Sequence, residues 1–282
     1  MRMTTPAALC AVVLAALLLA GAAPDPPEKT GDFILASTTS LRETGLLDLL
    51  AKRFEAATGI KMKAVALGTG QALAMARKGE ADAVIVHSRV DEDSFIGEGF
   101  GAGAVTLMEN RFLVVGPDAD PAKVTGAADA AGGFKAIADA GAAFVSRGDD
   151  SGTHVREKTI WARAGVAPDG KPWYIKSGTG MGQTLMIARE KKAYTLTDSA
   201  TWAVFQKTEG LKPVFDRGNE LRNTYRYIRV NEAKVPRVNA GAAKKFGEFL
   251  CAKETMAFIG AFEKGMAGGP LFSPLGCPEL KK

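Results

Sequence analysis

Residues 33–87 read FILASTTSLRETGLLDLLAKRFEAATGIKMKAVALGTGQALAMARKGEADAVIVH, and this stretch decides the fold. Short apolar runs alternate in it with segments whose apolar residues recur every three or four positions. Thr44 is a candidate N-cap of the first helix, and Gly59 is a candidate C-terminal stop. The alternation predicts strands at 33–35, 62–67 and 81–87, and helices at 46–57 and 71–78. This β-α-β-α-β order is typical of an α/β domain with a mainly parallel sheet.

The middle of the chain repeats the alternation, which indicates a second unit of the same class. It contains predicted strands at 143–146 and 194–196, and predicted helices at 153–164 and 181–190. Strand-like residues 111–115 and 225–230 lie between the two patterns and predict two crossovers. The Gly/Ala-rich segment 126–133 is interpreted as a surface connection.

We therefore expect two lobes, each a mainly parallel sheet with flanking helices. Residues 31–110 form the first part of lobe 1, residues 111–225 form lobe 2, and residues 226–282 return to lobe 1 and end in a C-terminal tail. Ligands of open α/β sheets bind at the carboxyl ends of the strands. A ligand is expected in the cleft between the lobes.

Residues 1–23 have the pattern of an export signal. Arg2 precedes an apolar run at 7–20, and small residues follow it, so cleavage is expected near Ala22 or Ala23. The run is shorter than the roughly 20 residues of a membrane-spanning helix. We expect a periplasmic protein. Cys251 and Cys277 then remain as an even pair in an oxidising compartment, which predicts a disulfide.

Composition narrows the class of ligand. The net charge of +5 favours an anion, whereas the scattered Lys and Arg residues do not indicate nucleic-acid binding. With two histidines and three cysteines in the whole chain, we expect no metal-cation site. We also expect no cofactor and a monomeric protein.

Three strand-to-helix turns are rich in glycine and small hydroxyl residues. They are residues 37–40 (STTS), 68–70 (GTG) and 146–153 (SRGDDSGT). The first turn of a helix has unpaired backbone N–H groups and the positive end of the helix dipole, so it can bind an anion. Hydroxyls add neutral donors. The alternative is that these residues are ordinary N-caps.

Arg147 adds a planar fork of donors in the third turn, suited to two oxygens of an oxyanion. Its alternative role is a surface ion pair with Asp149 or Asp150. His87 and His154 fit structural roles better than catalytic ones. Ser151 with His154 leaves a secreted serine hydrolase as an alternative, although the nucleophile-elbow motif G-x-S-x-G is absent.

These motifs resemble those of one known family, the tungstate-binding proteins of the Tup-type ABC transporters. The resemblance covers nearly the whole chain after the export signal, and 146–154 is its most specific part. The other matching segments are 37–40 with 43–50, 68–73, 108–110, 173–174, 180–185, 194–198 and 223–230. Ser37 departs from the expected run of three threonines but keeps a hydroxyl.

The resemblance implies a two-lobed (type II) periplasmic binding protein rather than an enzyme. It implies capture of a tetrahedral oxyanion, most often tungstate, and delivery to a membrane permease. By position, the implied oxyanion contacts are Thr38, Thr39, Thr69, Arg147, Ser151, Gly152 and Thr153. Molybdate, phosphate and sulfate remain alternatives. Phosphate keeps a proton near neutral pH and would need an acceptor such as Asp149 or Asp150.

Overall fold

The computed structural model describes residues 31–205, 210–262 and 270–278. The predicted export signal at 1–23 lies outside these residues. Among the helices of the described part, none combines the length and the apolar character that crossing a bilayer requires.

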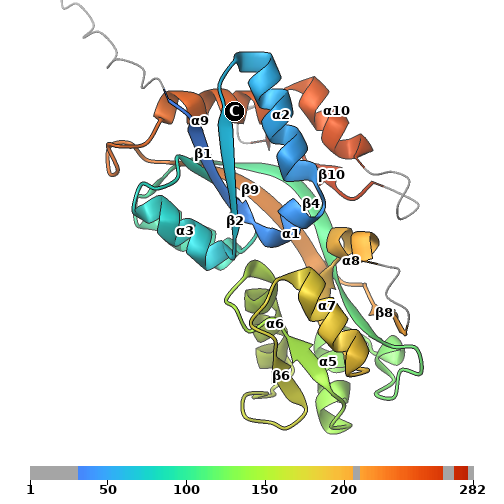
Figure 1. The fold of residues 1–282 in the computed structure, drawn as a ribbon. Coiled ribbons are helices and arrows are strands. Elements are labelled where there is room, and N and C mark those ends of the chain that lie inside the picture. The colour runs from blue at the N-terminus through green and yellow to red at the C-terminus, as the bar shows by residue number, and fades with distance from the viewer. Residues whose placement is uncertain (1–30, 206–209, 263–269, 279–282) are drawn as a thin grey trace, which may run out of the picture.

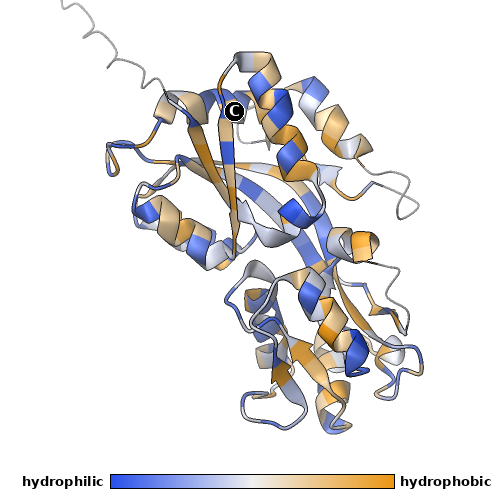
Figure 2. Cartoon of the chain, in the orientation of Figure 1, coloured by the Kyte–Doolittle hydropathy of each residue, from blue (hydrophilic) through white to orange (hydrophobic). Residues whose placement is uncertain are grey.

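The predicted β-α-β-α-β unit forms one end of the molecule (Figure 1). Strand β1 lies between two parallel neighbours, with Leu35 opposite Ala64 of β2 and Ala83 of β3. The elements are β1 (Phe33–Thr38), α1 (Thr39–Glu43), α2 (Leu46–Thr58), β2 (Met62–Leu67), α3 (Thr69–Arg77), β3 (Ala83–Val86) and α4 (Arg89–Gly97). Figure 2 shows both hydrophilic and hydrophobic residues along α2, whose apolar side packs on the sheet.

Two long strands carry the chain between the lobes. Strands β4 (Gly101–Pro117) and β9 (Arg222–Val230) pair antiparallel from Gly101 opposite Val230 to Arg111 opposite Arg222. β9 also pairs antiparallel with β3, and β4 continues into the second lobe. The predicted crossover segments are therefore parts of paired strands. They add antiparallel pairs to a sheet that is parallel at β2, β1 and β3, which the sequence patterns did not indicate.

The second lobe lies below the first in Figure 1 and is built on the far end of β4. Strands β7 and β8 pair antiparallel with β4, while β5 pairs parallel with β6. The elements are a 3-10 turn (Val124–Gly126), α5 (Ala130–Asp139), β5 (Phe144–Ser146), α6 (Gly152–Arg163), β6 (Tyr174–Lys176), α7 (Met181–Glu190), β7 (Thr195–Asp198), α8 (Ser199–Phe205), β8 (Leu211–Phe215) and a second 3-10 turn (Asn219–Leu221).

The apolar core is divided in the same way. One buried cluster centres on Phe33, Phe54 and Phe246, and another centres on Phe134 and Trp161 in the second lobe. Helix α8 follows β7 in the chain, yet its Ala200 and Ala203 pack into the cluster of the first lobe. The buried apolar side chains of the described residues thus form separate clusters in the two lobes, with α8 at the junction.

Two local predictions are wrong. Gly45, in the left-handed conformation at φ 81°, precedes α2, whereas Thr44 ends α1 and its hydroxyl oxygen accepts a bond from the Leu46 N–H. The segment 126–133 is not simply a surface connection, because α5 begins at Ala130, which is buried. The side chain of Asp129 caps this helix by accepting from the Gly132 N–H. Gly59 ends α2 as predicted.

The C-terminal helices return to the first lobe. These are α9 (Ala240–Cys251) and α10 (Lys253–Ala261), followed by β10 (Ser273–Pro274) against β4. Cys251 and Cys277 form a disulfide with a Cα–Cα distance of 5.8 Å, so the predicted pairing is confirmed. The bond ties the last described segment to the end of α9.

Candidate functional site

The first predicted turn lies where β1 ends and α1 begins. Thr38 is an N-cap, since its hydroxyl oxygen accepts from the Leu41 N–H at 3.4 Å. Thr39 lies 3.4 Å from Nη2 of Arg147, which belongs to the other lobe. Ser37 instead donates its hydroxyl to the Ile85 carbonyl at 2.9 Å, within the sheet. Thr39 is thus the residue of this turn that contacts the second lobe through a side-chain hydrogen bond.

The second turn starts α3, and the hydroxyl of its threonine does not cap the helix. Thr69 is fully buried, and its Oγ1 has no hydrogen-bond partner among the described residues. A Cβ on Gly68 would lie 3.6 Å from the Asp149 carbonyl oxygen, and one on Gly70 would lie 3.7 Å from that of Asp150. These two glycines therefore let the second turn lie against the third turn, across the junction of the lobes.

The third turn starts α6 and contains one hydroxyl that caps the helix and one that has no hydrogen-bond partner among the described residues. Ser151 caps the helix by accepting from the His154 N–H at 3.3 Å. Thr153 is fully buried, and within the described chain its Oγ1 is unpartnered. Capping thus accounts for Thr38 and Ser151 but not for Thr69 or Thr153. A buried hydroxyl without a partner costs free energy, so these two hydroxyls call for another explanation.

Arg147 is buried, with 3% of its side chain exposed. Its Nη2 lies 2.5 Å from Oδ2 of Asp149, and its Nε donates to the Thr179 carbonyl at 3.3 Å. An ion pair with Asp149 was one of the two predicted roles, but the pair lies between the lobes and not at the surface. A buried guanidinium with a single carboxylate partner retains donors for an anion.

His87 is a residue of this region that the sequence interpretation left as structural. It directly follows β3, is 6% exposed, and its Nδ1 has no partner among the described atoms. A Cβ on Gly152 would lie 2.8 Å from this nitrogen. Burial lowers the pKa of His87 to about 4; Asp198 opposes this effect and Arg147 adds to it. The imidazole is therefore neutral near pH 7. The sequence signal that could have indicated a place in the site was its position at the end of a predicted parallel strand.

Glu43 places a carboxylate beside the same junction. A Cβ on Gly180, which precedes α7, would lie 3.2 Å from Oε1 of Glu43. Burial raises the pKa of this carboxyl, and the neighbouring Arg147 opposes the rise. Glu43 belongs to the first lobe and α7 to the second, so this contact also joins the lobes.

The predicted turns therefore meet at one place. The two lobes bring together the N-terminal ends of α3 and α6, the guanidinium of Arg147 and the two hydroxyls that lack partners among the described residues. This arrangement can bind an anion, because the donors are buried and a cation is present.

Comparisons with known proteins identify the family. A model described as a PBP superfamily domain matches residues 22–254. The tungstate-binding protein TupA of Peptoclostridium acidaminophilum is 41% identical over 276 residues, which cover 94% of this chain and 96% of that relative. The chain belongs to the Tup-type tungstate-binding protein family of the PBP superfamily.

Two solved structures of similar Tup-type proteins agree in fold. The tungstate ABC transporter structure from Geobacter sulfurreducens is 40% identical with a TM-score of 0.72, covering 81% of this chain and 97% of that one. TupA from Desulfovibrio alaskensis G20 is 38% identical with a TM-score of 0.73, covering 86% and 98%. The predicted two-lobed binding-protein fold is confirmed, and so is the prediction of a binding-protein family rather than an enzyme.

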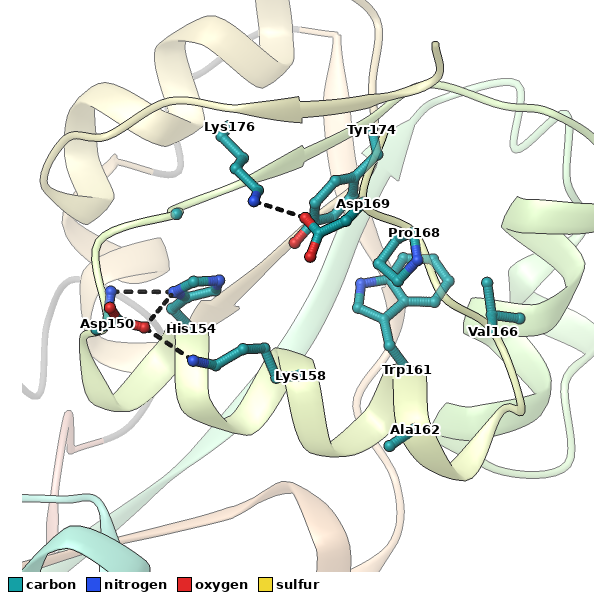
Figure 3. A pocket seen from close by; sticks show the side chains of 11 residues that line it. Asp150, His154, Lys158, Trp161, Ala162, Val166, Pro168, Asp169, Tyr174 and Lys176 are labelled. Carbon is teal, nitrogen blue, oxygen red and sulfur yellow. Dashed lines mark hydrogen bonds and ion pairs between the residues drawn. The ribbon is translucent and has the colours of Figure 1, made fainter. Parts of the chain in front are cut away.

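The serine-hydrolase alternative is wrong for this Tup-type chain, and the geometry explains why. Figure 3 shows the His154 ring in a cavity of about 380 Å³ beside α6, where its Nδ1 accepts from the Asp150 N–H at 3.0 Å. Asp150 also pairs with Lys158 at 2.8 Å. Ser151 Oγ bonds to the backbone of His154 and not to its ring. Within the described part of the chain, the contacts of Ser151 do not include a general base that would activate its hydroxyl.

Proposed function

We propose that this protein captures a tetrahedral oxyanion, tungstate, between its lobes and delivers it to an ABC permease. One observation carries the proposal. The buried hydroxyls of Thr69 and Thr153 come from different lobes, start α3 and α6, and lack partners. The names of the relatives support tungstate as the ligand.

The proposed contacts are those expected from the sequence. Thr69, Thr153 and the Gly152 N–H supply neutral donors, and Arg147 supplies the positive charge that a desolvated dianion requires. The hydrogen bond between Thr39 and Arg147 supports including Thr39 among these contacts. Thr38 and Ser151 already bond to backbone N–H groups through their oxygens, so they would offer their hydroxyl protons to the ligand.

The two acceptors predicted for phosphate are already bonded to other groups. Asp149 uses Oδ2 for Arg147 and Oδ1 for the Ser151 N–H at 3.2 Å. Asp150 is largely exposed and pairs with Lys158. Both predicted acceptors are therefore engaged elsewhere, whereas tungstate needs donors alone. Glu43 is a further carboxylate at the junction, and its Oε2 is buried without a hydrogen-bond partner among the described residues. Molybdate has nearly the same size and charge and stays the alternative ligand.

The cellular setting forms part of the proposal. Residues 1–23 would export the chain to the periplasm, where the protein acts as a monomer with a permease as its partner. Lobe 1 would comprise residues 31–110 and 226–282, and lobe 2 residues 111–225. The separate apolar clusters support this division except at α8 and Tyr225, which pack into the cluster of the first lobe.

Calorimetry on the purified protein with tungstate, molybdate, sulfate and phosphate at one pH tests the ligand. We expect one-to-one binding of tungstate, with sulfate and phosphate at least about a hundredfold weaker, a difference of about 2.7 kcal/mol. Equal binding of sulfate or phosphate would refute the assignment.

A further inference from the structure

We propose that His87 contacts the captured oxyanion and donates one hydrogen bond to it from Nδ1. This inference rests on the proposed function and adds a neutral ring donor to the site. It assigns a ligand-binding role to a residue whose sequence context indicated a structural one.

The position of the ring is the first argument. His87 follows β3 of the first lobe, and a Cβ on Gly152 would lie 2.7 Å from its Cε1 and 2.8 Å from its Nδ1. Gly152 is the first residue of α6 in the second lobe. The edge of the imidazole with the unpartnered nitrogen therefore faces the helix start at which Thr153 has its unpartnered hydroxyl.

Aromatic neighbours restrict the ring. The Tyr225 ring centroid lies 4.8 Å from that of His87, and the Phe112 centroid lies 6.1 Å away. A side chain held in this way can offer a donor without losing much conformational freedom on binding. The His87 ring is thus held in place before the ligand binds, with Nδ1 already in position.

The chemistry of a neutral imidazole determines the direction of the bond. Such a ring has one N–H donor and one acceptor nitrogen. An oxyanion without protons presents acceptors alone, so Nδ1 must carry the hydrogen in the complex. Buried unpartnered nitrogen is costly in the free protein, and the ligand removes this cost.

A packing role is the competing explanation, because the ring also covers Gly152. The two roles respond oppositely to two substitutions. His87→Phe keeps the aromatic bulk and removes Nδ1, whereas His87→Asn loses the bulk and keeps an N–H donor near the Nδ1 position. His154→Asn is the matched control, since its amide oxygen can still accept from the Asp150 N–H.

Tungstate calorimetry on these variants and the wild type separates the explanations. We expect about 10- to 100-fold weaker binding by His87→Phe, as for a lost hydrogen bond to a charged group. We expect His87→Asn to bind more tightly than His87→Phe and His154→Asn to stay within about threefold of wild type. Wild-type affinity in His87→Phe would overturn the inference, while a wild type that binds no tungstate would overturn the proposed function itself.

Nitrogen-15 NMR on the wild-type protein gives an independent reading. The sequence contains two histidines, so the His154→Asn spectrum assigns the remaining signals to His87. We expect the Nδ1–H tautomer of His87 in the tungstate complex. The Nε2–H tautomer in that complex would overturn the inference even if His87→Phe failed to fold.

Discussion

Arg147 and Asp149 form an ion pair within one turn, with Nη2 of the arginine 2.5 Å from Oδ2 of the aspartate and 3% of the arginine side chain exposed. Asp149 therefore orients the guanidinium and offsets part of its charge. The pair thus brings the proposed ligand donor Arg147 and a carboxylate together at the lobe junction.

Replacing Arg147 with Ala should weaken tungstate binding by about 2 to 5 kcal/mol, the usual cost of removing one partner of a buried charge pair. Arg147→Lys should recover part of this loss, because an ammonium keeps the charge but not the two-oxygen fork. Calorimetry and melting temperatures on the same preparations check both. Unchanged affinity in Arg147→Ala would show that the guanidinium serves Asp149 alone.

Thr69→Val and Thr153→Val should each weaken tungstate binding by about 1 to 3 kcal/mol, because each removes a donor. The ligand-free proteins should be as stable as wild type or more so, since both hydroxyls are buried without partners. Thr195→Val is the matched control: Thr195 is equally buried, its Oγ1 is also unpartnered, and it lies in β7 outside the three turns. A loss of affinity in Thr195→Val would contradict the assignment of the site.

Gly152→Ala should weaken binding at least tenfold, or about 1.4 kcal/mol. Its Cβ would lie 2.7 Å from Cε1 of His87 and would push the lobes apart. Alanine suits a helix start, so the melting temperature without ligand should change little. Gly97→Ala, where a Cβ meets nothing within 4 Å, is the control and should bind as wild type does. Tight binding by Gly152→Ala would mean that the two lobes need not meet at this glycine.

Glu157 should make stability depend on pH. Burial raises the pKa of its carboxyl from 4.5 to about 7, and hydrogen bonding by Tyr174 opposes the rise. The folded state thus binds more protons than the unfolded state between these values, so the free energy of unfolding falls as pH rises through them. Glu157→Gln should remove this dependence and exceed wild type in stability above pH 7, by at most on the order of 3 kcal/mol.

Urea titrations of wild type and Glu157→Gln at pH 5, 6, 7 and 8 measure this difference. The glutamine oxygen can still accept from the Tyr174 hydroxyl, which lies 2.7 Å from Oε1 of the glutamate. Parallel stability curves for the two proteins would show that Glu157 does not titrate in this range.

The disulfide should stabilise the folded protein. Replacing both Cys251 and Cys277 with Ser should lower the free energy of unfolding by about 3 kcal/mol, as expected for a closed loop of about 25 residues. Thiol labelling of the denatured, unreduced protein should find no reactive cysteine at either position. Two labelled thiols would contradict the pairing.

The first half of lobe 1 could be predicted from periodicity because its signals are local. Residues 62–67 form the predicted strand, and in the second lobe residues 181–190 likewise form the predicted helix, both without any shift of the boundaries. The strand character of 225–230 was predicted, but its place beside β3 in the sheet was not. The antiparallel pairing of β9 with β3 depends on residues more than 130 positions apart in the chain. Helix α8 likewise packs on both lobes, with Ala200 and Ala203 against the first and Trp202 and Phe205 against the second.

The sequence by itself determined the family, the alternation of strands and helices, and the three turns with donors, because turn chemistry and helix starts depend on neighbouring residues. The tertiary structure alone decided which donors are already used. Thr38 and Ser151 cap helices, Thr69 and Thr153 remain unpartnered, and His87 faces Gly152. The reason is physical. Whether a polar group is buried and hydrogen-bonded depends on residues that folding brings together from both lobes, and a local sequence pattern does not show which residues these are.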